Sequence, residues 1–176
     1  MAQEKKRRGR RAHLDDFQKT ATGDYVYSGK LHPFKPGAFT RRQALLRLWL
    51  AAAGLAAVLV AAGCIPVAGM RNTFYVILPY AASLLAAASV VWLMCRLTAG
   101  GDPLRDYVYA ATVAQFRLRG AVTAVLCAAA LAGEGLCLAL NGPEDTLAGS
   151  VVFLLCEAAG LVLALLWRSV AVRLDW

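Results

Sequence analysis

Four long apolar segments, separated by short polar stretches, constrain the fold of this chain more than any other feature. They cover residues 45–65, 74–95, 120–140 and 147–167. Each has about the 20 residues that an α-helix needs to cross the roughly 30 Å of hydrocarbon in a lipid bilayer. None shows the two-residue alternation of a barrel strand, and a helix satisfies its own backbone hydrogen bonds in lipid. The sequence therefore predicts an all-α, integral membrane four-helix bundle.

The first apolar segment could instead be an export signal that is cleaved. Arg41-Arg42 resembles the start of a twin-arginine signal, and Ala61 to Cys64 loosely resemble a lipoprotein cleavage box. Both matches are partial, because a long and mostly polar stretch precedes the arginine pair. In addition, three more apolar segments follow Cys64 where an exported protein would have a soluble domain. These observations favour a permanent first helix.

The distribution of basic residues predicts the orientation in the membrane. Of the 19 Lys and Arg residues, only Arg71 lies in the first connection, and none lies in the third, residues 141–146. The others lie before or near the start of the first segment, in the second connection or after the fourth segment. Since Lys and Arg are retained on the cytoplasmic side, both termini are expected to be cytoplasmic. The expected location is a plasma membrane of the bacterial type.

The tryptophans also cluster at one predicted boundary of the membrane. They are Trp49, Trp92, Trp167 and Trp176. An indole at this depth can keep its ring in hydrocarbon and its N–H among the headgroups, so we expect all four to be interfacial anchors.

Residues 1–42 form a basic N-terminal tail, distinct from the spanning domain of residues 43–176. The densest basic cluster consists of Lys5, Lys6, Arg7, Arg8, Arg10 and Arg11. Such a cluster could bind nucleic acid. Beside a membrane anchor, however, contact with anionic lipid headgroups or plain solvation is the simpler interpretation, at about 1 kcal/mol per basic residue near the surface. We therefore expect anionic lipid headgroups, and no nucleic acid, as partners of the tail.

The rest of the tail permits a small hairpin. Tyr25, Tyr27 and Leu31 flank the turn-forming pair Ser28-Gly29. Because an isolated hairpin of this size is marginal in water, two alternatives stay open. The segment could order only on a partner, or on the cytosolic ends of the helices.

The second connection predicts a helical extension over residues 103–119. Gly100-Gly101 should end the preceding helix, Asp102 is a typical N-cap residue, and Pro103 suits the first helical position. Apolar residues then recur every three or four positions. The extension would project into the cytosol or lie along the headgroups. It could bind a protein partner or be no more than a capped, solvated helix.

Two ionisable residues interrupt the apolar segments, Glu134 in the third and Glu157 in the fourth. A charged residue at mid-membrane costs about 2.5 to 3.5 kcal/mol on insertion scales, while each Leu, Val or Phe returns only about 0.3 to 0.6. The fourth segment has enough of these residues to offset its glutamate, but in the third the gain and the cost roughly cancel. We therefore expect the third segment to need helical neighbours.

Small and polar residues recur every three or four positions around both glutamates. In the third segment this stripe comprises Gly120, Thr123, Cys127, Ala130, Glu134 and Cys137. In the fourth segment it comprises Thr146, Ser150, Phe153, Glu157, Gly160 and Ala164. Small residues let helix backbones approach, and polar residues find partners across the seam. The two stripes should therefore face each other or the bundle interior.

The short third connection forces an antiparallel pair of helices. Folding the chain about the middle of this connection places Glu134 level with Phe153 and Glu157 level with Ala130. The two carboxyl groups then differ in depth by about four residues, or roughly 6 Å. Together with Thr123 and Ser150, they form a candidate intramembrane polar site.

Three roles are open for this site. Each glutamate could bond a neighbouring carbonyl or hydroxyl and simply stabilise the bundle. The site could instead act as in a proton-coupled carrier or a cation site, because two carboxyl groups so near each other in a medium of low dielectric constant cannot both ionise cheaply. The same groups could also recognise a partner protein. Arg71 is the one base on the outer side that could pair with Glu134.

The remaining residues do not indicate catalysis. The five cysteines have no CxxC or Cys/His ligand spacing, so we expect no metal and no cofactor. A disulfide between Cys64 and Cys137 is conceivable from position alone. The chain has no phosphate-binding glycine loop, nucleophile elbow or pair of metal-binding histidines, which makes an enzyme improbable.

Together these patterns predict a small multi-pass membrane protein that is not an enzyme. The expected role is that of an accessory or scaffolding subunit that binds a protein partner or forms a homo-oligomer. The alternative is a small proton- or ion-coupled transporter that uses Glu134 and Glu157.

Overall fold

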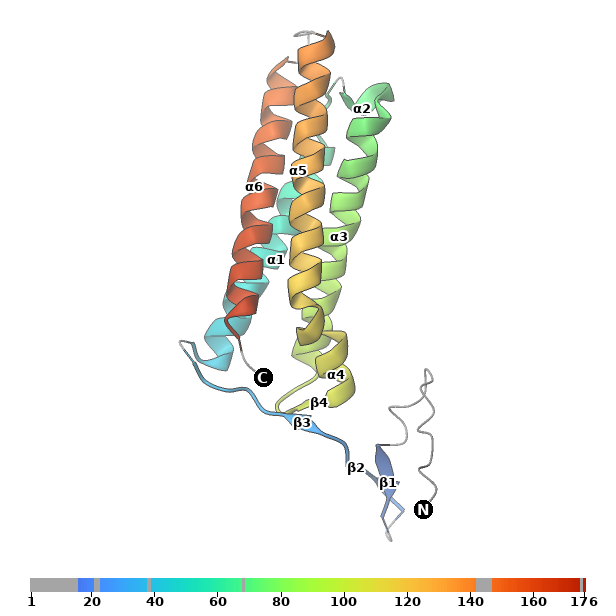
Figure 1. The fold of residues 1–176 in the computed structure, drawn as a ribbon, viewed down its shortest axis with the longest axis vertical. Coiled ribbons are helices and arrows are strands. Elements are labelled where there is room, and N and C mark those ends of the chain that lie inside the picture. The colour runs from blue at the N-terminus through green and yellow to red at the C-terminus, as the bar shows by residue number, and fades with distance from the viewer. Residues whose placement is uncertain (1–15, 21–22, 38, 68, 142–146, 175) are drawn as a thin grey trace, which may run out of the picture.

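Four long helices form the body of the molecule (Figure 1). The computed structural model describes residues 16–20, 23–37, 39–67, 69–141, 147–174 and 176, without the side chains of residues 71, 72 and 141. The long helices are α1 (Arg41–Gly63), α3 (Phe74–Ala99), α5 (Phe116–Asn141) and α6 (Leu147–Val172). A short helix, α2 (Gly69–Asn72), lies between α1 and α3. Each long helix is long and apolar enough to cross a membrane, which confirms the helical class expected from the sequence.

The long helices alternate in direction around the bundle, in the cyclic order α1, α3, α5, α6 (Figure 1). Gly120 of α5 lies against Trp167 of α6, and Cys127 lies against Gly160. This is the register expected from folding the chain about its third connection. By the same register, Glu134 is level with Phe153.

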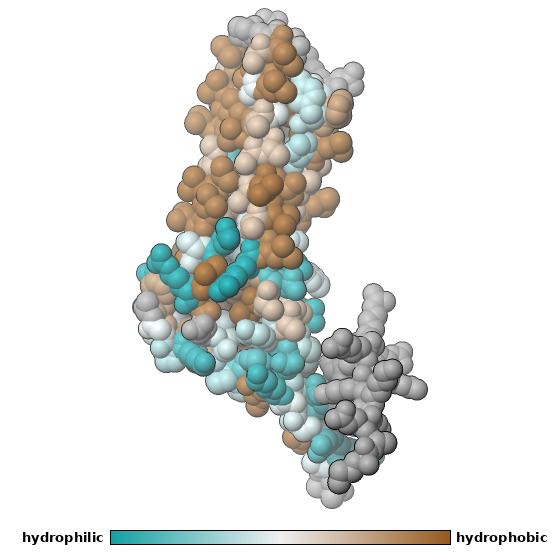
Figure 2. Space-filling view, in the orientation of Figure 1, coloured by the Kyte–Doolittle hydropathy of each residue, from teal (hydrophilic) through white to brown (hydrophobic). Residues whose placement is uncertain are grey.

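The interior of the bundle combines the small and polar stripes of α5 and α6 with large apolar side chains such as Leu59 and Leu93. The outside of the bundle is apolar (Figure 2). Every described member of the two stripes is buried, as expected, including both glutamates; Thr146 lies outside the described residues. Large apolar side chains are also exposed, among them Leu50, Leu85, Val125, Leu136, Leu155 and Val162. This arrangement suits a bundle whose surroundings are as apolar as its surface.

One end of the bundle carries a cap of residues 16–20, 23–37, 39–40, 100–115, 173–174 and 176 (Figure 1). We call this the cap end, and the opposite end, where α2 lies, the loop end. Leu104, Val108 and Trp176 of the cap share a buried cluster with Leu48 and Leu97 of the helices. The cap is therefore packed on the bundle through a continuous apolar core.

The strands of the cap pair differently from the expected hairpin. Strand β1 (Phe17–Lys19) pairs antiparallel with β2 (Tyr25–Tyr27), so the hairpin turn precedes Tyr25. Strand β3 (Leu31–His32) leaves this hairpin and pairs with β4 (Leu104–Arg105) of the second connection. The structure thus agrees with the alternative in which this part of the tail orders on the ends of the helices.

The second connection also differs from the single helix expected over residues 103–119. Helix α3 ends before Gly100, as expected, and Gly101 has the positive φ of 72° that suits glycine. The chain is then extended in β4, because it pairs there with β3. Helix α4 (Asp106–Ala111) and a 3₁₀ turn, η2 (Val113–Gln115), follow before α5 begins.

Two of the four tryptophans are not interfacial anchors, so this expectation was wrong for them. Trp167 is buried against Phe116, with 5.2 Å between the ring centroids. Trp176 is buried in the cap against Phe34, at 5.0 Å. The helix ends close around these rings, so their indole groups face protein. Trp92, which is 69% exposed, fits the interfacial expectation.

The close approach of α3 and α5 predicts that alanine substitutions at two glycines of α5 have opposite effects on the stability of the bundle. A Cβ at Gly133 would lie 2.5 Å from the backbone oxygen of Tyr75, which has no freedom to rotate away. Gly133→Ala should therefore destabilise the bundle by about 1–3 kcal/mol. Gly135 has nothing within 4 Å of such a Cβ, so Gly135→Ala should be neutral or stabilise by up to about 1 kcal/mol.

Thermal unfolding of the detergent-solubilised protein measures both effects. Equal shifts for the two variants would contradict the proposed contact between the helices.

Candidate functional site

Glu134 lies on the inner face of α5, toward the loop end. Its side chain is fully buried and packs against Gly69 of α2. A Cβ at Gly69 would collide with the carboxyl group and would also approach Val76 of α3 within 3.1 Å. Neither carboxyl oxygen has a hydrogen-bond partner among the described residues. The site is thus a tight pocket that holds a carboxyl group with no partner among the described side chains, and it depends on the absence of a side chain at position 69.

Glu157 lies one turn before Gly160 on α6 and is also fully buried. Gly160 contacts Leu59 of α1 and Cys127 of α5, which places this part of α6 at the centre of the bundle. The carboxyl group is near enough to Tyr80 and Cys127 to interact with them electrostatically. Within the described part of the chain, neither of its oxygens has a hydrogen-bond partner.

An aromatic pair lies in the bundle interior, with Phe153 at the level of Glu134. Tyr80 and Phe153 pack with 5.7 Å between their ring centroids, in one buried cluster with Ala62 and Ala130. The Tyr80 hydroxyl donates to the backbone oxygen of Leu59 at 2.8 Å, so its proton is used in a hydrogen bond to α1. The described contacts therefore place the two glutamates in separate surroundings.

The other two residues of the expected polar site lie at different depths. Thr123 donates to the backbone oxygen of Arg119 at 2.8 Å, which satisfies its hydroxyl within its own helix. Ser150 is fully buried, and its hydroxyl has no partner in the described structure. By the register of α5 and α6, Ser150 is level with Cys137, one turn from Glu134. The four residues thus do not form one site; Ser150 belongs with the level of Glu134, and Thr123 lies deeper toward the cap.

Two expectations concern the partners of these glutamates. The first was that each glutamate bonds a neighbouring carbonyl or hydroxyl, and no such bond occurs in the part of the chain that the structure describes. The pairing of Glu134 with Arg71 cannot be followed, because the Arg71 side chain lies outside the described residues.

The cysteines form no disulfide, and all five belong to the described part of the chain. Cys64 is exposed and Cys137 is buried, so the pair that was conceivable from sequence is not joined. No group of three or more potential metal ligands occurs among the described residues.

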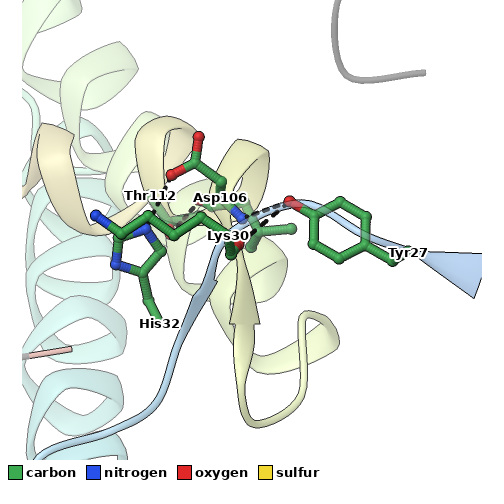
Figure 3. Close-up of polar contacts among 6 residues, drawn as sticks. Tyr27, Lys30, His32, Asp106 and Thr112 are labelled. Atoms are coloured by element: carbon green, nitrogen blue, oxygen red, sulfur yellow. Dashed lines mark hydrogen bonds and ion pairs between the residues drawn. The ribbon is translucent and has the colours of Figure 1, made fainter. Parts of the chain in front are cut away.

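Polar contacts join distant segments of the cap to one another (Figure 3). His32 Nε2 donates to Asp106 Oδ1 at 2.9 Å, and the imidazole stacks on Tyr109 with 4.1 Å between ring centroids. The Tyr27 hydroxyl donates to the backbone oxygen of Lys30 and accepts from the backbone N–H of Asp106 at 3.1 Å. These bonds tie the tail to the start of α4.

Arg105 connects the β1–β2 hairpin to the second connection. Its guanidinium lies 5.6 Å from the ring centroids of both Phe17 and Tyr27. The hairpin extends away from the bundle beyond this contact (Figure 1). On it, Tyr25 is 70% exposed and Val26 is 53% exposed. The cap thus presents an apolar, aromatic strand that no described residue covers.

A second contact centre of the cap was missed by sequence reasoning. Arg41 Nη2 donates to the backbone oxygen of Gly101 at 2.6 Å, and Nε lies 3.8 Å from Asp102 Oδ2. The guanidinium also lies 5.7 Å from the Trp176 ring centroid, and Asp102 accepts from the backbone N–H of Phe34. Asp102 is therefore used in this contact and does not cap a helix.

The sequence did contain one signal for where α1 begins. Thr40 and Gln43 form a capping box, in which each side chain bonds the backbone N–H of the other residue. This pattern places Arg41 in the first turn of α1. The basic cluster expected to bind anionic lipid, residues 5–11, lies outside the described residues.

Comparison with known proteins gives no match. No protein-family model, no curated protein and no solved structure is significantly similar to this chain. Its function therefore has to be inferred from its own residues.

The unpaired carboxyl group of Glu157 predicts an unusual gain in stability. Glu157→Met keeps the side chain long but removes the buried carboxyl group, which should stabilise the folded bundle by up to about 2–3 kcal/mol. Glu157→Gln retains a polar group of the same shape and should give a smaller gain.

Thermal unfolding in detergent, compared with the unmodified protein, checks this prediction. A lower unfolding temperature for Glu157→Met would mean that the carboxyl group has a stabilising partner.

Proposed function

We propose that this chain is a non-enzymatic accessory or scaffolding subunit of a bacterial-type plasma membrane. It would cross the membrane four times, with both termini on the cytoplasmic side. The observation that carries this proposal is the cap, in which three segments far apart in sequence pack together and hold out a hairpin with apolar side chains that no described residue covers. A protein that acted only within the bilayer would have no need of such a structure.

The charge distribution supports the proposed orientation. Twelve described Lys and Arg residues lie in the cap or at the helix ends beside it: Lys19, Lys30, Lys35, Arg41, Arg42, Arg47, Arg96, Arg105, Arg117, Arg119, Arg168 and Arg173. Basic residues near membrane-spanning helices are retained in the cytoplasm. The cap is then available to cytoplasmic proteins.

The hairpin is the part of the cap best suited to bind a partner. A two-stranded sheet leaves backbone N–H and C=O groups unpaired along both of its edges. A strand from another protein can pair with such an edge, while exposed side chains such as Tyr25 and Val26 supply apolar contact. Arg105 limits the motion of the hairpin and so reduces the entropy lost on binding.

The bundle interior supports a structural role over transport. The rings of Tyr80 and Phe153 pack together in the interior, and Phe153 is level with Glu134. An ion that moved through the bundle at the level of Glu134 would have to displace these rings.

Site-specific photocrosslinking tests the scaffold proposal. A photoreactive amino acid at position 26 of the full-length protein should give a discrete protein adduct in native membranes. Position 85, which is exposed near the middle of α3, should not give that adduct. Arg105→Ala should lower the yield at position 26 severalfold, because it releases the hairpin. Adducts that are identical from positions 26 and 85 would contradict a partner bound at the hairpin.

One observation favours a second function, a proton- or ion-coupled transporter that works as an oligomer. Both glutamates are buried without a hydrogen-bond partner among the described residues, which is costly unless the carboxyl groups serve a purpose.

Proton-driven flux in reconstituted vesicles decides whether this second function exists. If the protein is a transporter, Glu134→Gln and Glu157→Gln should each abolish a flux that the unmodified protein supports, with assembly intact. Gly135→Ala serves as the control, because it lies beside Glu134 and meets no neighbouring atom. Unchanged flux in both glutamine variants would exclude the carboxyl groups from transport.

A further inference from the structure

We propose that the cap end of α6 carries a binding site for an anionic phospholipid, formed by Arg168 and Arg173. The phosphodiester would bind the two guanidinium groups, and an acyl chain would lie along Leu165. This inference rests on the proposed insertion in a membrane but not on the role of the hairpin or of the glutamates.

The site is an open cavity of about 330 Å³ on the outer face of α6. It is lined by Leu165, Arg168, Ser169, Val172 and Arg173. These residues follow one another at helical spacing, so they share one face, and all five are exposed. The cavity therefore opens toward the surroundings and not into the bundle.

The cavity lies where the apolar surface of the helices ends. Val162 and Leu166 are exposed just before it along α6, and Arg168 is the first basic residue of that helix. Figure 2 shows hydrophilic side chains gathered directly below the apolar cylinder, over the ends of α5 and α6. In a bilayer this is the depth of the lipid phosphates.

The two arginines are available to bind an anion. Neither forms an ion pair or a side-chain hydrogen bond within the described part of the chain. The acidic side chains Asp102 and Asp106 at this end face Arg41 and His32 instead. Guanidinium groups bind phosphate oxygens through paired hydrogen bonds, which suits a phosphodiester. Ser169 donates to the Leu166 backbone at 2.8 Å, so recognition of the anion falls to the arginines.

A third arginine adds positive charge on the other side of Val172. Arg117 of α5 and Val172 both line a second cavity, of about 340 Å³, between α5 and the end of α6. Three exposed arginines thus surround one apolar side chain at this corner of the bundle. The combination of cationic groups with an apolar floor fits an amphiphile better than it fits a soluble anion.

Helix α3 supplies a matched control at the same end of the bundle. Its outer face has a cavity of about 360 Å³ lined by Trp92, Cys95, Arg96 and Ala99. The two cavities are similar in size and lie at the same end of the bundle, but the α3 cavity has one arginine where the α6 cavity has two. Arg96→Gln therefore removes a boundary arginine without touching the proposed site.

Native mass spectrometry of the full-length protein, released from nanodiscs of phosphatidylcholine and phosphatidylglycerol, tests the proposal. The basic cluster Lys5, Lys6, Arg7, Arg8, Arg10 and Arg11 is replaced by Gln in every sample, to remove lipid binding by the tail. The expected result is preferential retention of phosphatidylglycerol, which Arg168→Gln/Arg173→Gln lowers by about tenfold or more and Arg96→Gln leaves unchanged. Arg168→Lys/Arg173→Lys should keep part of the preference, because it keeps the charge but loses the paired hydrogen bonds.

Several outcomes would overturn the proposal. One is retention of phosphatidylglycerol that is the same in the double glutamine variant as in the protein that carries only the tail substitutions. An equal loss of phosphatidylglycerol retention in Arg96→Gln would also overturn the proposal. Displacement of the lipid by inorganic phosphate, which has no acyl chain, would overturn it as well. A change in oligomer mass without a change in lipid retention would identify the face as a contact between protein chains. Thermal unfolding of each variant in phosphatidylcholine checks that the fold is retained. None of these results would contradict the proposal that the chain crosses the membrane four times.

Discussion

Close approach of helix backbones is the constraint on which the rest of the structure depends. In an apolar solvent, helices gain little from burying apolar side chains, so they associate where small residues allow dense packing. Here Gly133 meets the backbone of α3, and Gly160 meets both α1 and α5. These contacts fix the register of neighbouring helices. The register in turn sets the depth of each carboxyl group and brings the segments of the cap to one end.

The two buried carboxyl groups lie at different levels of the bundle interior. Gly69 has no side chain, and the carboxyl group of Glu134 occupies the space beside it. Tyr80 and Phe153 pack together in the interior, with Phe153 at the level of Glu134. Buried carboxyl groups without a hydrogen-bond partner among the described residues raise the free energy of the folded bundle, and the dense packing elsewhere compensates for it. The interior therefore combines locally unfavourable polar sites with an otherwise well-packed core.

The parts of the fold that follow from periodicity could be predicted, and those that depend on long-range contacts could not. Segment lengths gave the four helices, the spacing of Gly120, Cys127 and Glu134 gave the buried face of α5, and the short third connection gave its register with α6. The role of Trp167 was missed, because a tryptophan near a membrane boundary looks the same in sequence whether it faces lipid or protein. The pairing of Leu31 with Arg105 and the contact of Arg41 with Trp176 join residues far apart in sequence, and no local pattern specifies them. Thr40 and Gln43 were the exception, a local pattern that could have been read.

The contact of Arg41 with Trp176 has a consequence for the order in which the protein is made. Phe34 and Arg41 leave the ribosome early, but the ring that they pack against is added only after α6 has been synthesised. Until then, this part of the tail lacks its aromatic neighbour. This part of the tail thus acquires its final surroundings only after all four long helices have been synthesised.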